Sequence, residues 1–213
     1  MDLPNNTIDR VCRIFGCLES LEERQVDFVS SKDLAQAIGT TNDTIRKDIS
    51  LLGVTGYTRK GYSVVSLKKE LGQTLKLDKK RKACIVGLGR LGTALLDYER
   101  FKQDGFEIVA GFDNSINKLE RIKTHIDVFA ISEMENIIAQ KSIELGIITV
   151  PANNAQEVAD ELIKAGVSGI LNFSPEKIVV PKEIIYLDMD FTSALRFIAA
   201  RFITNKLRKS RVA

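Results

Sequence analysis

Residues 83–92 read ACIVGLGRLG, an apolar run that leads directly into a glycine-rich turn. The run Ala83–Val86 is typical of a short buried strand, and Thr93–Phe101 after the turn has helical spacing. A GxGxxG turn between a strand and a helix is the pattern that holds the pyrophosphate of a dinucleotide, whereas the same glycines without that context would mean little. The stretch therefore predicts an α/β domain of the Rossmann type.

The three glycines of this turn have separate expected roles. Gly87 permits a tight turn, Gly89 lets the backbone approach a phosphate, and Gly92 lets the helix pack closely on the strand. The N-terminus of the helix then presents amides and a positive dipole to the phosphates. We expect a cofactor to contact Gly87, Leu88, Gly89, Arg90, Leu91 and Gly92.

The identity of the dinucleotide is predicted from Asp113, which stands 21 residues after Gly92 at the end of a second strand, Ile108–Phe112. A carboxylate at that place accepts hydrogen bonds from the adenosine ribose hydroxyls and repels a 2′-phosphate. Asn114 and Ser115, which follow, offer no arginine to hold such a phosphate. The residues therefore favour NAD(H) over NADP(H).

The remainder of the chain alternates strand and helix patterns, which implies a doubly wound parallel sheet with helices on both faces. A ligand of such a sheet lies at the carboxyl ends of the strands, so the turns there should border the cofactor. These turns add Val150, Pro151, Ala152, Asn172 and Phe173 to the expected cofactor site. The expected strands are 128–130, 143–150, 168–173 and 184–187, and the expected helices are 133–140, 155–165 and 191–207.

The amino-terminal third has a different character. Helical patterns occupy 8–22, 33–38 and 44–52, and a short turn containing Gly39 joins the last two. Two short helices joined in this way match the helix-turn-helix motif. The second of them carries residue types suited to base edges and phosphates, which are Thr44, Arg46, Lys47 and Ser50.

A wing is expected behind this motif. Residues 54–65 place aromatic and β-branched side chains around glycines, which indicates a β-hairpin, and a helix is expected at 67–77. The basic pair at the hairpin tip, Arg59 and Lys60, is placed to reach phosphates or a narrow minor groove. From residue 44 to residue 82 the chain has 11 Lys/Arg against 3 Asp/Glu. Such a concentration of positive charge favours a polyanion as partner.

Other features limit the alternatives. No run approaches the ~18 apolar residues of a membrane span, and the first residues lack the pattern of a secretory signal, so a cytoplasmic location is expected. Cys12, Cys17 and Cys84 lack metal-ligand spacing and indicate no disulfide framework. His125 is the only histidine and lies far from the strand ends that border the cofactor. The sequence therefore predicts no metal site and no catalytic residue, which suits a ligand sensor better than a dehydrogenase.

Ordered matches along nearly the whole chain make it resemble Rex, a family of redox-sensing transcriptional repressors. The matching segments are IRKDIS at 45–50, CIVGLGRLG at 84–92, DY at 97–98, GFD at 111–113, TVPA at 149–152, AQEVAD at 155–160, GILNFSP at 169–175 and VP at 180–181.

The resemblance implies a homodimer of three-part chains. Residues 1–80 would form a winged-helix DNA-binding domain, 81–188 a Rossmann dinucleotide-binding domain, and 189–213 a helix and tail exchanged between subunits. It also implies binding to palindromic operators when NADH is low and release by NADH. Tyr98 would lie near the nicotinamide, and Asp190 would be an aspartate whose partners change with redox state. The residues alone equally allow a core position for Tyr98 and an N-cap role for Asp190.

Two departures from the family pattern leave alternatives open. Gly16 stands where family members tend to place an arginine that pairs with the aspartate, and Arg13 lies one turn earlier. Leu51 and Leu52 replace an aromatic pair, and the arginine of the wing is shifted by one position. A paralogue with a weak or altered redox response therefore remains possible, as does a small NAD-dependent dehydrogenase.

Overall fold

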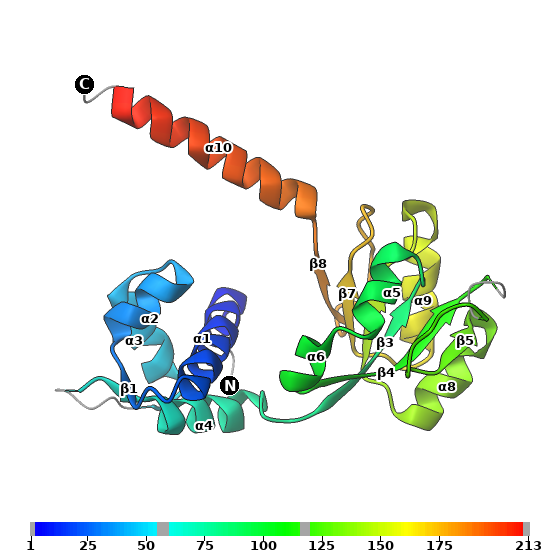
Figure 1. The fold of residues 1–213 in the computed structure, drawn as a ribbon, viewed down its shortest axis with the longest axis horizontal. Coiled ribbons are helices and arrows are strands. Elements are labelled where there is room, and N and C mark those ends of the chain that lie inside the picture. The colour runs from blue at the N-terminus through cyan, green and yellow to red at the C-terminus, as the bar shows by residue number, and fades with distance from the viewer. Residues whose placement is uncertain (1–2, 55–59, 116–119, 211–213) are drawn as a thin grey trace. The chain divides into compact units, whose positions relative to one another are not determined.

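The computed structural model describes residues 3–54, 60–115 and 120–210. Contacts within the chain divide it into two compact units, Met1–Lys79 and Lys80–Ala213 (Figure 1). Within the described ranges, no helix has both the length and the apolar composition that crossing a membrane requires.

The first unit is a small helical domain with one short pair of strands. Apolar side chains recur every three or four residues along its first helix, where Val11, Ile14 and Leu18 are fully buried. These side chains share one core with residues of the other three helices. The elements are α1 (Asn5–Glu23), β1 (Phe28–Val29), α2 (Ser31–Ile38), α3 (Asn42–Leu51), β2 (Tyr62–Ser63) and α4 (Val64–Leu75).

The predicted helix-turn-helix is confirmed as α2 and α3. A capping box opens α2, because Ser30 Oγ accepts from the Asp33 N–H at 3.1 Å while the Asp33 carboxylate accepts from the Ser30 N–H. The helix ends at Gly39, whose φ of 72° is a conformation that glycine adopts without strain. Thr41 then caps α3 by accepting from the Thr44 N–H at 3.2 Å.

The region expected to form the wing differs from the prediction. β2 pairs antiparallel with β1, a strand of two residues that is too short for its alternation to be visible in the sequence. α4 begins at Val64, three residues earlier than expected and inside the predicted hairpin, because Ser63 caps it by accepting from a backbone N–H at 3.4 Å. Arg59, at the predicted hairpin tip, lies outside the described residues.

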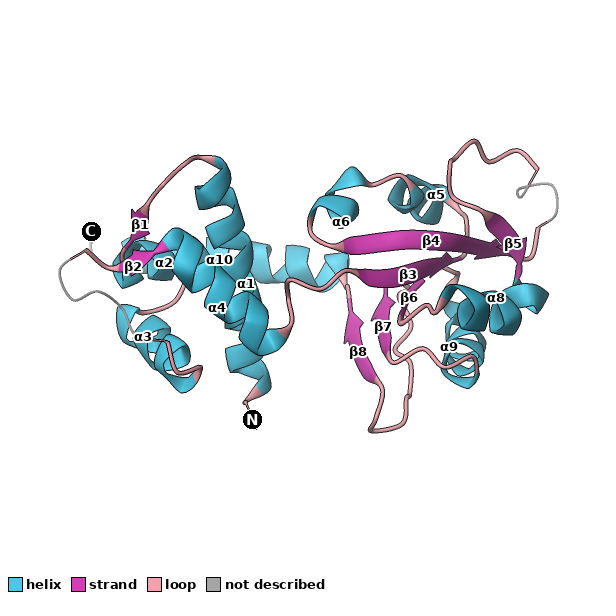
Figure 2. Cartoon of the chain, turned by 90° about the horizontal axis from the view of Figure 1, so that it is seen from below, coloured by secondary structure: helices cyan, strands magenta, loops and turns pink. Residues whose placement is uncertain are grey.

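The second unit contains a six-stranded sheet in which every neighbouring pair is parallel. The strands lie in the order β5-β4-β3-β6-β7-β8, which Figure 2 shows side by side. The chain therefore starts in the middle, runs to one edge and then reverses between β3 and β6, which is the Rossmann strand order. The strands are β3 (Arg81–Val86), β4 (Phe106–Asp113), β5 (Val128–Ala130), β6 (Leu145–Ile148), β7 (Gly169–Asn172) and β8 (Ile185–Asp188).

Alternating side chains of the strands enter two different cores. Cys84 and Val86 pack with α8 (Met134–Lys141) and α9 (Ala155–Lys164). Ala83 and Ile85 point to the opposite face, where they pack with Leu88 and Leu96 from the segment after β3. The helices accordingly lie on both sides of the sheet (Figure 2).

One expected helix is in fact two. The pattern over 93–101 predicts a single helix, but the structure has α5 (Arg90–Leu96) and α6 (Glu99–Gln103). The interruption falls at Asp97, whose carboxylate accepts from the Thr124 hydroxyl at 2.8 Å, and at Tyr98, whose backbone is extended. Thr124 and Asp97 are 27 residues apart, so their contact cannot be predicted from the spacing of apolar residues within the helix.

The second face of the sheet is only partly covered. The chain between β7 and β8, residues 173–184, is described throughout and forms no helix that could pack on this end of the sheet. An apolar cavity of about 510 Å³ lies over this part, lined by residues of β6, β7, β8 and α6. The last helix, α10 (Phe191–Ser210), is exposed at every position from Phe191 to Thr204.

Candidate nucleotide-binding and DNA-binding sites

The glycine turn after β3 has the geometry that its sequence predicts. Gly87 has a φ of 98°, and a Cβ there would stand 2.7 Å from a methyl group of Val150. A Cβ at Gly92 would clash with the backbone oxygen of Gly87. At Gly89, by contrast, a Cβ would meet no atom within 4 Å. Two glycines therefore serve packing, and the third leaves an open place beside the backbone.

A cavity of about 440 Å³ lies beside this turn, at the carboxyl ends of β3, β4 and β6. This is the reversal point of the strand order, where ligands of doubly wound sheets bind. The residues that line it come from the turn, from the ends of the strands and from α9. They are Gly87, Gly89, Asp113, Asn114, Ile131, Thr149, Val150, Pro151, Asn154, Glu157, Val158 and Glu161.

Asp113 is buried at the wall of this cavity and also organises it. Its Oδ2 accepts from the Leu88 N–H at 2.8 Å, and its Oδ1 accepts from the Ser115 N–H at 2.8 Å. The carboxylate thus fixes the glycine turn to the end of β4. An ionised carboxylate only accepts hydrogen bonds, which is the chemistry that binding to ribose hydroxyls requires.

Sequence reasoning missed three polar residues of the cavity. The Thr149 hydroxyl donates to the backbone oxygen of Gly87 at 2.7 Å and so ties β6 to the turn. Glu157 and Glu161 line the cavity from α9, where a spacing of four puts them on one helix face. Burial and the charge of Glu157 raise the pKa of Glu161. The spacing of the two glutamates by four residues is the sequence signal that could have identified this pair.

The other predicted cofactor residues lie in different surroundings. Val150 and Pro151 line the cavity, and Ala152 begins the short turn that follows them. Asn172 does not line it, because its amide donates to Glu176 O at 2.8 Å and to Asp188 Oδ1 at 2.9 Å. Phe173 also lies outside the lining. Its ring stands 5.8 Å from the ring of Phe191.

The two predicted switch residues lie apart from the glycine-turn cavity. Tyr98 is half-exposed, lines the apolar cavity and packs edge-on against Phe101 with ring centres 5.1 Å apart. Asp190 caps α10 by accepting from the N–H groups of Thr192 and Ser193 at 2.9 and 3.0 Å. Hydrogen bonds from Ser193 lower the pKa of the Asp190 carboxyl.

His125 offers no acid–base group to either cavity. Its ring is exposed and lies 3.5 Å from the Asp97 carboxylate, and it lines neither space. Across the described ranges, no group of three or more histidine, cysteine, aspartate or glutamate side chains is arranged to hold a metal ion.

The outer face of α3 gathers the residues that the sequence assigns to DNA. Arg46, Lys47 and Ser50 are exposed and line one shallow hollow together with Leu51. Arg46 forms an ion pair with Asp43, which lowers the pKa of that carboxyl.

Three predicted DNA contacts remain: Arg59 lies outside the described residues, and Thr44 and Lys60 do not line this hollow. Thr44 is half-buried, with its hydroxyl 2.8 Å from that of Thr41. Lys60 is exposed and lies 5.4 Å from the centre of the Phe28 ring.

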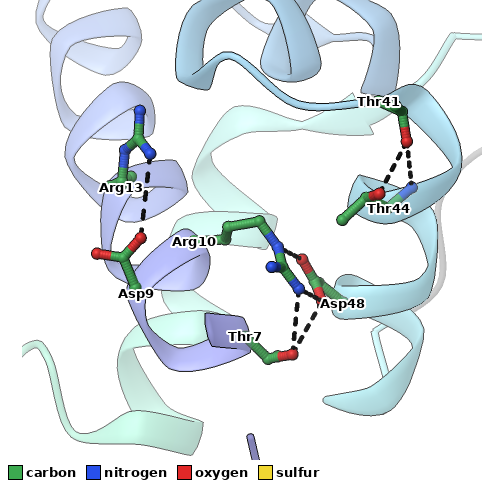
Figure 3. Close-up of polar contacts among 7 residues, drawn as sticks. All are labelled: Thr7, Asp9, Arg10, Arg13, Thr41, Thr44 and Asp48. Atoms are coloured by element: carbon green, nitrogen blue, oxygen red, sulfur yellow. Dashed lines mark hydrogen bonds and ion pairs between the residues drawn. The ribbon is translucent and has the colours of Figure 1, made fainter. Parts of the chain in front are cut away.

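The inner face of α3 carries a charge that sequence reasoning did not single out. Asp48 is buried between the apolar Ile45 and Ile49, and its side chain is only 3% exposed. Figure 3 shows that Arg10 and Thr7 of α1 reach it. Arg10 Nε lies 2.6 Å from Asp48 Oδ2 and Arg10 Nη2 lies 2.8 Å from Oδ1, while the Thr7 hydroxyl donates to Oδ1 at 3.2 Å. The hydrogen bond with Asp48 raises the pKa of the Arg10 guanidinium.

The surroundings of Gly16 are open, and the arginine one turn earlier is engaged. A Cβ at Gly16 would meet no atom within 4 Å. Arg13 Nη2 donates to the backbone oxygen of Ile38, the last residue of α2, at 2.6 Å. Arg13 therefore caps the carboxyl end of α2.

Comparisons with known proteins agree with both units. A family model described as "Putative DNA-binding protein N-terminus" matches residues 2–50, and one described as "CoA binding domain" matches residues 78–176. The redox-sensing transcriptional repressor Rex of Carboxydothermus hydrogenoformans is 38% identical over 89% of this chain and 91% of its own length. Rex 1 of Thermotoga maritima is 35% identical over 94% of this chain and 96% of its own length.

Solved structures resemble the whole chain. The crystal structure of the Rex-family repressor RSP in complex with beta-NAD+ and operator DNA has a TM-score of 0.85 and 32% identity, and covers 99% of this chain and 97% of that one. The structure of RSP in complex with beta-NADH has a TM-score of 0.86 and 30% identity, and covers 99% of this chain and 98% of that one.

A helix-turn-helix domain joined to a Rossmann domain, with a cavity at the glycine turn, is the architecture of a ligand-responsive transcription regulator. With 38% identity over nearly its whole length to a named member, the chain belongs to the Rex family of redox-sensing transcriptional repressors. Members of this family are repressors and not enzymes, so the chain is a regulator despite its dehydrogenase-like fold, and the dehydrogenase alternative is set aside.

Proposed function

We propose that this chain is a homodimeric repressor that binds a palindromic operator when NADH is low and leaves it when NADH binds. The observation that carries the proposal is the glycine-turn cavity with Asp113 at its wall, in the same chain as an exposed basic helix-turn-helix. Residues 1–80 would bind DNA, 81–188 would bind the cofactor, and 189–213 would be exchanged between subunits. Because its target is the operator, we place the protein in the cytoplasm.

The cofactor we propose is NAD(H), held by residues 87–92, Asp113, Val150, Pro151 and Ala152. The open place at Gly89 fits a pyrophosphate, and Asp113 fits the adenosine ribose. Coenzyme A shares the ADP moiety with NAD but carries an extra phosphate on that ribose. Asp113, Glu157 and Glu161 give the cavity three carboxylates, which disfavour such a phosphate and the 2′-phosphate of NADP(H). Bound NAD(H) would supply a nicotinamide that is charged when oxidised and neutral when reduced.

The glycine-turn cavity is not lined by Asn172, Phe173 or Tyr98. In this proposal Asn172 acts indirectly, whereas Phe173 and Tyr98 would lie near the nicotinamide end of the ligand. Asn172 uses its amide to join β7 to β8, which supports a role in shaping the strand ends. Tyr98 and Phe173 belong to the same side of the sheet, where the nicotinamide end would extend. Asp190 stands two residues after the end of β8, so a change at that edge of the sheet can reach the cap of α10.

The DNA contacts we propose are Arg46, Lys47 and Ser50 on α3, with Thr44 at its beginning and Arg59 and Lys60 in the wing. An exposed face with two cations and a hydroxyl suits a major groove, in which arginine and lysine read guanine and hydroxyls bind either bases or phosphates. Two copies related by a twofold axis would read a palindrome.

The dimer is supported by two apolar surfaces that one chain leaves uncovered. α10 exposes Phe191, Leu195, Ile198 and Phe202, which recur at helical spacing. The apolar cavity over β6, β7 and β8 is the second surface. Exposed apolar area of this extent in a helix marks an interaction site, and a second copy of the chain offers a matching surface.

The proposal is tested by fluorescence anisotropy with a labelled duplex that the protein itself enriches from a random library. NADH, NAD+ and NADPH are titrated separately. We expect NADH to weaken DNA binding by about 5- to 150-fold, the usual range of allosteric coupling. NAD+ should not weaken it, and NADPH should act only at much higher concentration. Equal DNA affinity in all three titrations would show that the protein is not a redox sensor.

A second candidate, a Rex-family repressor with a weak redox response, is favoured by the engagement of Arg13 with Ile38. Arg13 is thereby committed within the first unit, and Gly16 has no side chain to offer. The test is Gly16→Arg, which has space for its Cβ and sits in the middle of α1. A response to NADH that appears only in this variant would support the second candidate, and an equal response in both proteins would reject it.

A further inference from the structure

The helix α1 holds both helices of the helix-turn-helix through three side chains. Thr7 and Arg10 contact Asp48 of α3, and Arg13 contacts the last backbone oxygen of α2. Thr7, Arg10 and Arg13 are spaced by three residues along α1, and Figure 3 shows Thr7 and Arg10 turned toward Asp48.

The burial of Asp48 is costly for packing alone. Its neighbours Ile45 and Ile49 are fully buried and apolar, so a leucine at 48 would extend the same core without desolvating a carboxylate. A buried ion pair is weak support for stability, because its attraction is largely offset by the loss of hydration. The bidentate pair of Arg10 with Asp48, together with the hydrogen bond from Thr7, instead fixes the orientation of α3 relative to α1.

That geometry lies directly behind the face that reads DNA. Asp48 adjoins Lys47 in sequence, and Arg46 and Ser50 lie within two residues of it on the exposed side of the same helix. A rotation of α3 about its axis would move these exposed side chains and stretch the hydrogen bonds to Asp48 together. Apolar contacts of Ile45 and Ile49 tolerate small rotations, whereas hydrogen bonds weaken steeply with angle.

We propose that Thr7 and Arg10 are positioning residues for sequence readout, which act through Asp48 by fixing the rotation at which α3 presents Arg46, Lys47 and Ser50. The inference rests on the proposed DNA binding. It goes beyond that proposal because it assigns sequence discrimination to two residues of α1, a different helix from the one proposed to read the DNA. Contacts to phosphates tolerate a small misplacement, but contacts to base edges do not.

The test compares two duplexes of equal length and composition in the full-length protein without NADH. One is the sequence that the wild-type chain enriches from a random library, and the other is a shuffled version. We expect Asp48→Asn and Arg10→Gln to lower the ratio of the two affinities by at least about tenfold, the effect of losing one good base contact. Affinity for the shuffled duplex should change by less than about twofold, because phosphate contacts set it.

The chain offers a matched control in a second ion pair of α1. Lys68 of α4 lies 2.6 Å from Glu22 of α1, and its ammonium also lies near Glu19 and the Phe15 ring of the same helix. Lys68→Met removes that pair and should lower the melting temperature while leaving the affinity ratio unchanged. If it lowers the ratio as much as Asp48→Asn does, the effect is one of stability and the proposal is wrong.

Conservative variants keep the test decisive if Asp48→Asn does not fold. Thr7→Val keeps the shape of a buried side chain and removes one hydrogen bond, whereas Thr7→Ser keeps the hydroxyl. The proposal expects the affinity ratio to fall in Thr7→Val and to be retained in Thr7→Ser. Equal ratios in the two would overturn it. A wild-type chain that does not distinguish the two duplexes would instead reject the proposed function.

Discussion

At the scale of single residues, Gly89 and Gly92 both lack a side chain, but the space around them is opposite. A Cβ at position 92 would run into backbone of the turn, whereas a Cβ at position 89 would stand in open space. We therefore expect Gly92→Ala to lower the free energy of unfolding by about 1–3 kcal/mol, the usual cost of overpacking. Gly89→Ala should leave stability unchanged or raise it by up to about 1 kcal/mol, because alanine restricts the unfolded chain.

The same pair separates packing from ligand binding. Because a methyl group at 89 would occupy the approach of the pyrophosphate, Gly89→Ala should weaken NADH binding in a protein of normal stability. The measurements are chemical denaturation for both variants and calorimetric titration of NADH into each. Normal NADH affinity in Gly89→Ala would mean that the phosphates do not lie at this turn.

The residue scale also shows where sequence reasoning reached its limit. The glycine roles and the position of Asp113 followed from local spacing, because a strand, a turn and a helix in succession determine one another. The pairing of Arg10 with Asp48 spans 38 residues, and that of Thr149 with Gly87 spans 62. Such contacts depend on how elements pack, and no local pattern records them.

At the scale of elements, the cap of α10 gives the chain a predictable response to acid. Hydrogen bonds from Ser193 and Thr192 hold the pKa of Asp190 below its ordinary value, so its stabilising effect is present above that ordinary value and lost as the pH falls through the lowered one. Asp190→Ala should thus reduce the helical signal and the melting temperature at pH 7. The difference from wild type should shrink toward pH 3, where the wild-type carboxyl is increasingly protonated.

The control for this prediction is Asp160→Asn, which removes an exposed carboxylate of α9 that lines neither cavity. It should show no comparable difference at pH 7. Circular dichroism melts of the three proteins from pH 3 to pH 7 provide the measurement. A constant gap between wild type and Asp190→Ala across this range would contradict a carboxylate cap.

The elements themselves were predictable in type and order but less so at their ends. Each strand pattern from 128 to 187 corresponds to a strand, since buried parallel strands are short apolar runs bounded by turns. The helix expected at 93–101 is broken at Asp97 and Tyr98, although its apolar spacing continues across the break. β1 could not be predicted, because a strand of two residues is too short to show an alternation of apolar and polar side chains.

At the scale of the whole molecule, the exposed apolar side of α10 predicts that the chain functions only as a pair. Leu195 is 66% exposed and Ile198 is 62% exposed in the single chain. Replacing both by glutamate leaves the cores of the two units untouched, so each unit should keep its secondary structure. Charges placed in an apolar interface are costly, so the variant should sediment as a monomer.

Loss of the dimer then has a consequence for DNA that a folding defect would not imitate. A monomer reads one half of a palindrome, so affinity for the full site should fall to that for an isolated half-site, while binding to the half-site itself is retained. Val179→Glu is the control, because it places a glutamate at an exposed apolar residue outside α10. It should remain a dimer with full operator affinity. If Leu195→Glu/Ile198→Glu stays dimeric, α10 is not the dimer interface. The apolar cavity over β6, β7 and β8 would then be covered by something other than α10 of a second copy.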